Sequence, residues 1–166
     1  MATEELQERF QNLVDEHKKI LYKVCNSYCP NSGDRDDLAQ EIVFQLWRSF
    51  KEYDGSSRFS TWMYRVALNV AISFYRRERV RARRVFSDPM VDVADERENQ
   101  SDDVRLLYQC IERLDPLNKA LMLLYLDGHS YAEIGEVLGI SETNVGTKVA
   151  RLKTAFRQQF GGTVRT

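Results

Sequence analysis

The chain has 166 residues, a formal net charge of −1, and 30% charged against 43% hydrophobic side chains. This length allows one large or two small domains, and the low content of glycine (8) and proline (3) favours helices. No window is apolar enough for a transmembrane helix and the polar, acidic N-terminus does not resemble a signal peptide, so we expect a cytoplasmic protein without membrane insertion.

The three cysteines lack the number and spacing of a disulfide framework, which is typical of a reducing compartment. Cys25 and Cys29 lie one helical turn apart, so a metal or redox pair is one interpretation. An ordinary pair of buried core thiols is the other, because no second pair of close thiols or imidazoles completes a tetrahedral site. We therefore expect no metal and no other cofactor.

Apolar residues recur at helical spacing over residues 4–28, which predicts one long amphipathic helix. Pro30 and Gly33 end this helix, and Asp34 is the predicted N-cap of a second helix that extends to residue 50. The second helix has a mixed acidic and apolar face, formed by Asp37, Gln40, Glu41, Phe44 and Arg48. Such a face suits a protein partner, although a solvated helix face is the commoner explanation.

A loop over residues 53–58 precedes a third helix, which is predicted to begin at Ser60 or Thr61. Its expected buried face contains Trp62, Val66, Val70 and either Ile72 or Phe74. Its expected outer face combines rings, cations and an amide, from Tyr64, Arg65, Asn69, Tyr75, Arg76 and Arg77. Rings stack on unpaired bases, arginines bind phosphates and an asparagine can read a base edge. The outer face therefore indicates single-stranded or locally opened DNA, unless it consists of core aromatics beside solvated arginines.

Charge is distributed unevenly along the middle of the chain. Residues 76–84 contain six arginines against one glutamate, whereas residues 87–103 contain seven acidic residues against one arginine. The acidic stretch has few large apolar side chains, so residues 85–103 are predicted to form a flexible linker. We expect an all-α protein with two small helical domains, over residues 1–84 and 104–166.

Two further helices are predicted after the linker. Val104, Leu107 and Ile111 recur at helical spacing, and Pro116 suits the first position of the next helix with Asp115 as its cap. The second of these helices is expected to end near residues 127–128 and to support the motif that follows.

The C-terminal domain contains a helix-turn-helix pattern. Residues 131–138 can form a short helix, Gly139 suits a left-handed C-terminal position, and Ser141 can cap the next helix. A small residue, Ala132 or Gly135, would let the two helices approach closely. The second helix is expected to bury Val145, Val149, Leu152 and Phe156. Its outer face can reach base edges and phosphates in a major groove. That face is formed by Glu142, Asn144, Lys148, Arg151 and Lys153.

Four stretches occur in a characteristic order: D-D-L-A-Q-E-I-V-F-Q-L-W (36–47), F-S-T-W-M-Y-R-V-A-L-N-V-A (59–71), L-D-P-L (114–117) and Y-A-E-I-G-E-V-L-G-I-S (131–141). Together with the basic run and the acidic linker, they resemble the extracytoplasmic-function (ECF) sigma factors, the short two-domain members of the sigma-70 family. The resemblance covers nearly the whole chain. It implies a protein that is not an enzyme but directs bacterial core RNA polymerase to specific promoters and opens the minus-ten region.

The resemblance implies three sets of site residues. The helix matching residues 36–50 would bind the β′ clamp helices of core polymerase through Asp37, Gln40, Glu41, Phe44 and Trp47. The loop and helix matching residues 53–77 would melt the promoter and hold its minus-ten element through Arg58, Tyr64, Arg65, Asn69, Tyr75, Arg76 and Arg77. The helix matching residues 141–156 would read the minus-thirty-five element through Ser141, Glu142, Thr143, Asn144, Thr147, Lys148 and Arg151.

Two positions depart from the family pattern, because Gly146 stands where a basic residue is frequent and Lys148 where arginine is usual. The resemblance also implies contact with the polymerase β subunit and control by an anti-sigma factor. In the family the acidic linker passes through the RNA exit path, whereas a solvated tether is equally consistent with this sequence.

Two other functions are open on the residues alone. A repressor or activator that binds duplex DNA by itself would leave the basic and aromatic third helix unexplained, and it would usually need a dimerisation element. An enzyme could hold Mg²⁺ with Asp36, Asp37 and Glu41, but all three lie on one helix, where caps and solvated acids are far commoner. The sequence contains no Walker loop and no recognisable serine–histidine–aspartate set.

Overall fold

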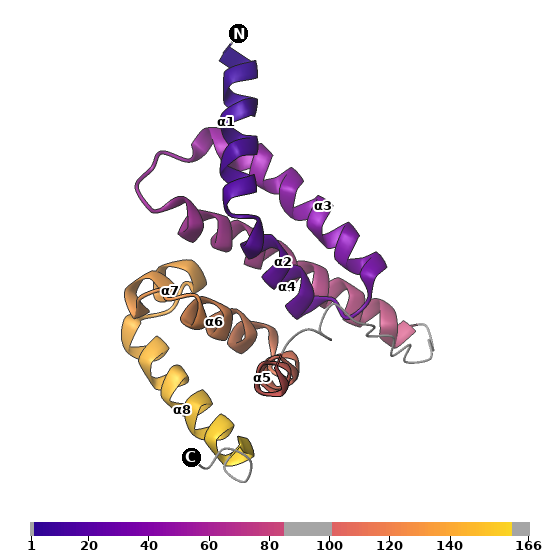
Figure 1. Ribbon diagram of the computed structural model, residues 1–166, viewed down its shortest axis with the longest axis vertical. Helices are drawn as coiled ribbons and strands as arrows, with labels where there is room; N and C mark the ends of the chain where they lie inside the picture. The colour runs from indigo at the N-terminus through magenta and orange to yellow at the C-terminus, as the bar shows by residue number, and fades with distance from the viewer. Residues whose placement is uncertain (1, 85–100, 161–166) are drawn as a thin grey trace. The chain divides into compact units, whose positions relative to one another are not determined.

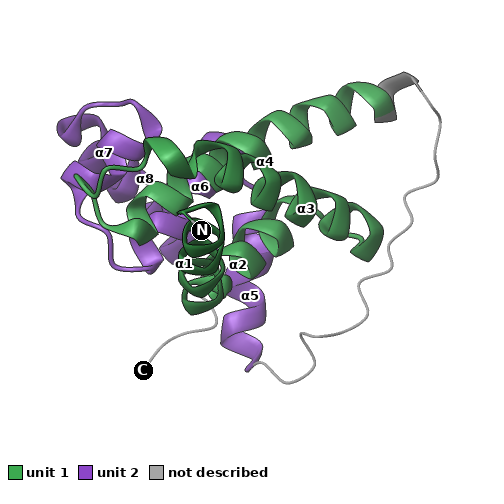
Figure 2. Cartoon of the chain, turned by 90° about the horizontal axis from the view of Figure 1, so that it is seen from above, with its two compact units in different colours: residues 1–98 green, residues 99–166 purple. Residues whose placement is uncertain are grey.

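The computed structural model describes residues 2–84 and 101–160, and these residues form helices joined by turns (Figure 1). The predicted all-α fold class is confirmed. Most of the linker predicted over residues 85–103 lies outside the described residues. The chain divides into two compact units, unit 1 over residues 1–98 and unit 2 over residues 99–166 (Figure 2). In the part of the chain that the structure describes, no helix combines the length and apolar character needed to cross a bilayer.

Unit 1 contains the helices α1 (Ala2–Glu16), α2 (Lys18–Tyr28), α3 (Ser32–Ser49) and α4 (Phe59–Arg84), with a short 3-10 turn, η1 (Phe50–Glu52). The prediction of one helix over residues 4–28 is wrong, because the backbone leaves helical geometry at His17 (φ −112°, ψ 19°). The break lets α1 and α2 pack in different directions. Helices α2, α3 and α4 pack on one another, while α1 projects beyond them (Figure 1).

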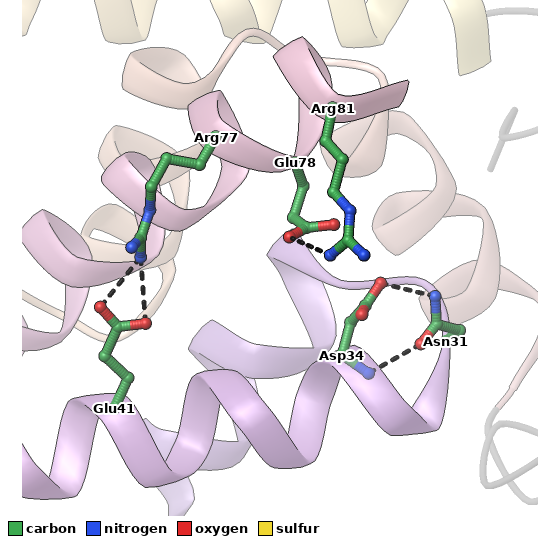
Figure 3. A network of polar contacts seen from close by, with 6 residues as sticks. All are labelled: Asn31, Asp34, Glu41, Arg77, Glu78 and Arg81. Atoms are coloured by element: carbon green, nitrogen blue, oxygen red, sulfur yellow. Dashed lines mark hydrogen bonds and ion pairs between the residues drawn. The ribbon is translucent and has the colours of Figure 1, made fainter. Parts of the chain in front are cut away.

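Helix α3 begins earlier than its sequence suggests, because Asn31 and not Asp34 is its N-cap. The Asn31 side-chain oxygen accepts a hydrogen bond from the Asp34 backbone N–H at 2.7 Å, and the Asn31 amide nitrogen donates to the Asp34 carboxylate at 2.7 Å (Figure 3). Asp34 therefore lies inside the first turn, where its charge also complements the positive end of the helix dipole.

Helix α4 buries a different face from the predicted one. It begins at Phe59, and its fully buried side chains include Met63, Tyr64, Ala67, Leu68 and Ala71. Phe74 is also buried, as predicted, whereas Trp62, Val66 and Val70 are only half-buried. The buried face therefore mixes large side chains with two alanines, and it lies where α4 packs on α2 and α3.

An aromatic cluster fixes the start of α4 and the loop before it. The ring of Phe10 on α1 lies 5.1 Å from Trp47 and 5.2 Å from Phe50, measured between centroids. Tyr53 lies 5.1 Å from Trp62 in the same way, and its hydroxyl donates to the Ser57 carbonyl at 2.8 Å. Tilted ring pairs at these separations are favourable beyond the area that they bury.

Unit 2 contains α5 (Asp102–Glu112), α6 (Pro116–Leu126), α7 (Tyr131–Leu138) and α8 (Glu142–Phe160). The Ser101 hydroxyl caps α5 by accepting from the Val104 backbone N–H, so residues 101–103 form a helix start and not part of a linker. Pro116 occupies the first turn of α6 with Asp115 at the N-cap position, as predicted. The Asp115 carboxylate accepts from the Asn118 side chain instead of from the backbone.

Candidate functional site

The turn between α7 and α8 has the predicted helix-turn-helix geometry. Gly139 ends α7 in the left-handed region (φ 73°, ψ 32°), and the Ser141 hydroxyl accepts from the Asn144 backbone N–H at 3.1 Å. The small residue at the close approach is Gly135, since a Cβ there would lie 2.6 Å from the Ile140 carbonyl oxygen. Ala132 is exposed and does not have this role.

Helix α8 separates a buried face from an exposed one. Val145, Val149 and Leu152 are buried and Phe156 is half-buried, in agreement with the predicted stripe. The predicted minus-thirty-five residues are exposed except for the half-buried Lys148; they are Ser141, Glu142, Thr143, Asn144, Thr147, Lys148 and Arg151. Most of the candidate reading surface is therefore accessible to a major groove.

Two α8 positions do not belong to that surface. The Lys153 ammonium lies 4.8 Å from the Tyr125 ring centroid, and its interaction with the Tyr125 hydroxyl raises the pKa of Lys153. Lys153 is half-buried, so it lies at the edge of the predicted outer face with its ammonium over a ring of α6. A Cβ at Gly146 would lie 3.6 Å from the Tyr131 ring, so position 146 faces α7.

On α4, four polar side chains recur at intervals of 7, 4 and 7 residues: Arg58 just before the helix, then Arg65, Asn69 and Arg76. At about 100° per residue they lie within roughly 40° of one another, and we call them the α4 polar stripe. Arg58, Asn69 and Arg76 are exposed, and Arg65 is half-buried. All four residues were among the predicted minus-ten contacts, but the sequence did not distinguish them from Tyr64, Tyr75 and Arg77, which lie elsewhere around the helix.

The two predicted aromatic contacts are not part of this stripe. Tyr64 has 0% exposure and lies in the core, so its predicted place on the outer face is wrong. Tyr75 is half-buried, and its ring lies 6.3 Å from the Tyr28 ring on α2. Tyr75 projects about 120° around the helix from Asn69.

A groove on unit 1 brings together three of the predicted polymerase-binding residues. Its volume is about 630 Å³, and we call it the α1–α3 groove. It is lined from α3 by Gln40, Phe44 and Trp47, with Ala39 and Val43, and from α1 by Gln7, Phe10 and Gln11. Phe44 is 59% exposed, which is unusual for a phenylalanine. The α1 contribution could not be predicted from the sequence, because it depends on the packing of Phe10 on Trp47, a contact between residues far apart in the chain.

The other two candidates on α3 lie outside the groove. Asp37 is exposed in the first half of the helix. Glu41 accepts two hydrogen bonds from Nη2 of Arg77 on α4, at 2.9 Å and 3.0 Å (Figure 3). The structure thus pairs a residue predicted to bind polymerase with one predicted to bind DNA.

The cysteine pair has the properties of core thiols. Cys25 and Cys29 are both buried and free, and burial raises the pKa of each to about 12. Protonated thiols are poor nucleophiles and poor metal ligands. Among residues 2–84 and 101–160, no group of three or more histidine, cysteine, aspartate or glutamate side chains is placed to hold a metal ion. Asp36, Asp37 and Glu41 therefore form no such group.

Two family models match the chain in order. Sigma-70 region 2 matches residues 13–81, and Sigma-70 region 4 matches residues 105–156, which together make up more than half of the chain. The chain belongs to the sigma-70 family. The α3 half of the groove and the α4 polar stripe lie within region 2, and α8 up to Phe156 lies within region 4. The α1 half of the groove precedes the region 2 match.

Curated relatives of this sigma-70 family member are ECF sigma factors. The ECF RNA polymerase sigma factor SigW of Bacillus subtilis (strain 168) is 27% identical, over 92% of this chain and 89% of the relative. The ECF RNA polymerase sigma-E factor of Escherichia coli (strain K12) is 29% identical, over 90% and 85%. This chain is an RNA polymerase sigma factor of the ECF type, in a family of transcription regulators.

Solved structures share the fold of this sigma factor. CnrH in complex with the cytosolic domain of CnrY matches with a TM-score of 0.67 and 21% identity, over 95% of this chain and 91% of that one. The sigma factor RpoE in complex with the anti-sigma factor NepR from Bartonella quintana matches with a TM-score of 0.67 and 17% identity, over 91% and 99%.

Proposed function

We propose that this sigma factor divides promoter recognition between three surfaces. The α1–α3 groove docks on the β′ clamp helices of core polymerase, the α4 polar stripe contacts the opened minus-ten element, and the exposed face of α8 reads the minus-thirty-five element. On this proposal residues 1–84 and 101–166 act as two domains, with residues 85–100 between them. The chain carries out no catalytic step of its own, and it acts in the cytoplasm.

Exposed Phe44 in the α1–α3 groove is the observation that carries the docking proposal. A groove of about 630 Å³ with Phe10 and Trp47 in its walls suits the apolar face of a helix, the kind of surface that clamp helices can present. Burying the exposed 59% of the Phe44 side chain would contribute about 1–2 kcal/mol. Exposed Asp37 on the same helix would supply a polar contact at the rim.

The chemistry of the α4 polar stripe favours a nucleic-acid strand. Three arginines spaced along the helix can bind phosphates of one strand, and the exposed Asn69 amide can both donate to and accept from a base edge. Tyr75 and Arg77 stand beside the stripe and are further candidates for the same strand. Tyr64 has no part in the proposal, because a core tyrosine cannot stack on a base without unfolding α4.

The proposed partners include an anti-sigma factor and the polymerase β subunit, as the family resemblance implies. A structural relative, RpoE of Bartonella quintana, is bound to an anti-sigma factor, which supports the first of these. Such an inhibitor would have to cover at least one of the three proposed surfaces.

Run-off transcription with purified core polymerase on genomic promoter fragments tests the proposal. The full chain should direct initiation from specific sites, and it should show no tight sequence-specific binding to duplex DNA without polymerase. Tight binding by the free chain would instead favour a repressor or activator. Permanganate footprinting should show less minus-ten opening with Asn69→Ala, whereas polymerase affinity should not change. Equal footprints for the variant and the unmodified chain would remove Asn69 from the minus-ten contact.

A further inference from the structure

We propose that Glu41 is a positioning residue for Arg77, holding its guanidinium at the edge of the minus-ten surface, and is not a contact to polymerase. The inference rests on the proposed function, because it needs a sigma factor whose α4 meets the opened strand. It changes the role that the family resemblance implies for Glu41.

The geometry of the pair is specific. One nitrogen of Arg77, Nη2, donates to both carboxylate oxygens of Glu41, at 2.9 Å and 3.0 Å (Figure 3). The Arg77 guanidinium carbon also lies 5.8 Å from the centroid of the Phe74 ring. The carboxylate and the ring therefore restrain the guanidinium from two directions, one across the α3–α4 contact and one along α4.

This arrangement leaves donors of Arg77 for a ligand. A guanidinium has five N–H groups, and the pair with Glu41 uses only those on Nη2. The Arg77 side chain is 62% exposed, so a strand can reach it without displacing other parts of unit 1. Arg77 follows Arg76 of the α4 polar stripe directly and projects about 80° around the helix from Asn69.

Glu41 is poorly placed for the polymerase. Its side chain is only 35% exposed, and both of its oxygens accept from Arg77. It does not line the α1–α3 groove, whereas its neighbours Gln40 and Phe44 do. A polymerase donor that took the acceptor positions now used by Nη2 would have to break the pair with Arg77 first.

Two physical effects follow from the pair. A restrained arginine loses less rotamer freedom when it binds a phosphate than a free one does. The carboxylate also neutralises charge that would otherwise attract any phosphate, so it lowers non-specific binding to duplex DNA. Glu41 should therefore favour the contact of Arg77 with the opened minus-ten strand over its contacts with non-specific duplex DNA.

The test is a double-mutant cycle with Glu41→Ala, Arg77→Ala and the double variant, each assembled with core polymerase. Permanganate reactivity of the minus-ten thymines measures opening, and a fluorescence titration measures affinity for polymerase. Glu41→Ala should lower opening by about two- to fivefold, the range that follows from losing one exposed ion pair. It should have no further effect in the Arg77→Ala background, and polymerase affinity should stay the same in all variants.

Two further variants separate positioning from a general structural role. Glu41→Gln keeps the side-chain length and one acceptor, so opening should lie between that of Glu41→Ala and that of the unmodified chain. Glu78→Ala is the matched control, because it removes a carboxylate of similar exposure to Glu41 (38% against 35%), one residue beyond Arg77, whose pair with Arg81 is long, at 3.9 Å. It should leave opening unchanged.

Specific results would overturn the inference. A loss of opening by Glu41→Ala that persists in the Arg77→Ala background, or an equal loss of polymerase affinity, would mean that Glu41 does not act through Arg77. Full opening with Glu41→Ala would have the same meaning. If the unmodified chain binds no polymerase, the proposed function itself fails, which is a different outcome from all of these.

Discussion

Gly146 lies in α8, and the structure predicts that Gly146→Ala stabilises unit 2. The glycine is within a regular helix, where it costs about 1 kcal/mol relative to alanine because of the backbone freedom that it loses on folding. A Cβ at this position would lie 3.6 Å and 3.7 Å from two carbons of the Tyr131 ring, which is ordinary van der Waals contact. The new methyl group therefore fits without moving its neighbours.

The expected gain in the free energy of unfolding is about 1 kcal/mol. For a unit of this size, such a gain corresponds to a rise in Tm of about 4–8 °C. Thermal unfolding of the full chain, followed by circular dichroism, measures it. The two tryptophans, Trp47 and Trp62, both lie in unit 1, so tryptophan fluorescence reports on unit 1 separately.

Gly135→Ala is the matched control with the opposite sign. Its Cβ would lie 2.6 Å from the Ile140 carbonyl oxygen, a backbone atom that cannot rotate away, so the free energy of unfolding should fall by about 1–3 kcal/mol.

A lower Tm for Gly146→Ala would refute the reasoning, because it would mean that α8 does not pack on Tyr131 in this register. Weaker binding to minus-thirty-five DNA in the assembled polymerase, with Tm raised, would show that DNA approaches the backbone at Gly146.

Three further predictions concern unit 1. Phe44→Ala should weaken binding to core polymerase by about 5- to 30-fold, which corresponds to the ~1–2 kcal/mol assigned to its burial. The control is Leu126→Ala, which removes an apolar side chain of unit 2 that is 48% exposed and should leave polymerase binding unchanged. A fluorescence titration measures the affinity of both variants. Tyr64→Ala should lower the free energy of unfolding by about 3–5 kcal/mol in urea denaturation, since it removes a fully buried ring, and unchanged stability would contradict its place in the core. The pKa values of Cys25 and Cys29, raised from 9.0 to about 12, mean that the native state binds more protons than the unfolded state between these values. Stability should therefore fall as pH rises from about 9 towards 12, and Cys25→Ser with Cys29→Ser should reduce that dependence.

The sequence alone predicted several features that depend on neighbouring residues, although it placed the N-cap of α3 at Asp34 instead of Asn31. Gly139, Ser141 and Pro116 act through hydrogen bonds and backbone preferences within one turn, and each lies where its local pattern predicts. The buried face of α8 was also predicted from the sequence, because this helix has a single apolar face.

Tertiary packing decided the rest. Helix α4 has two possible apolar faces, and the one with Ala67, Leu68 and Ala71 is buried where α4 packs on α2 and α3, which takes Tyr64 into the core. The α1–α3 groove and the pair of Glu41 with Arg77 both depend on residues far apart in the chain. Periodicity within one helix cannot reveal these contacts, because a periodic pattern states which face is apolar and not which partner covers it.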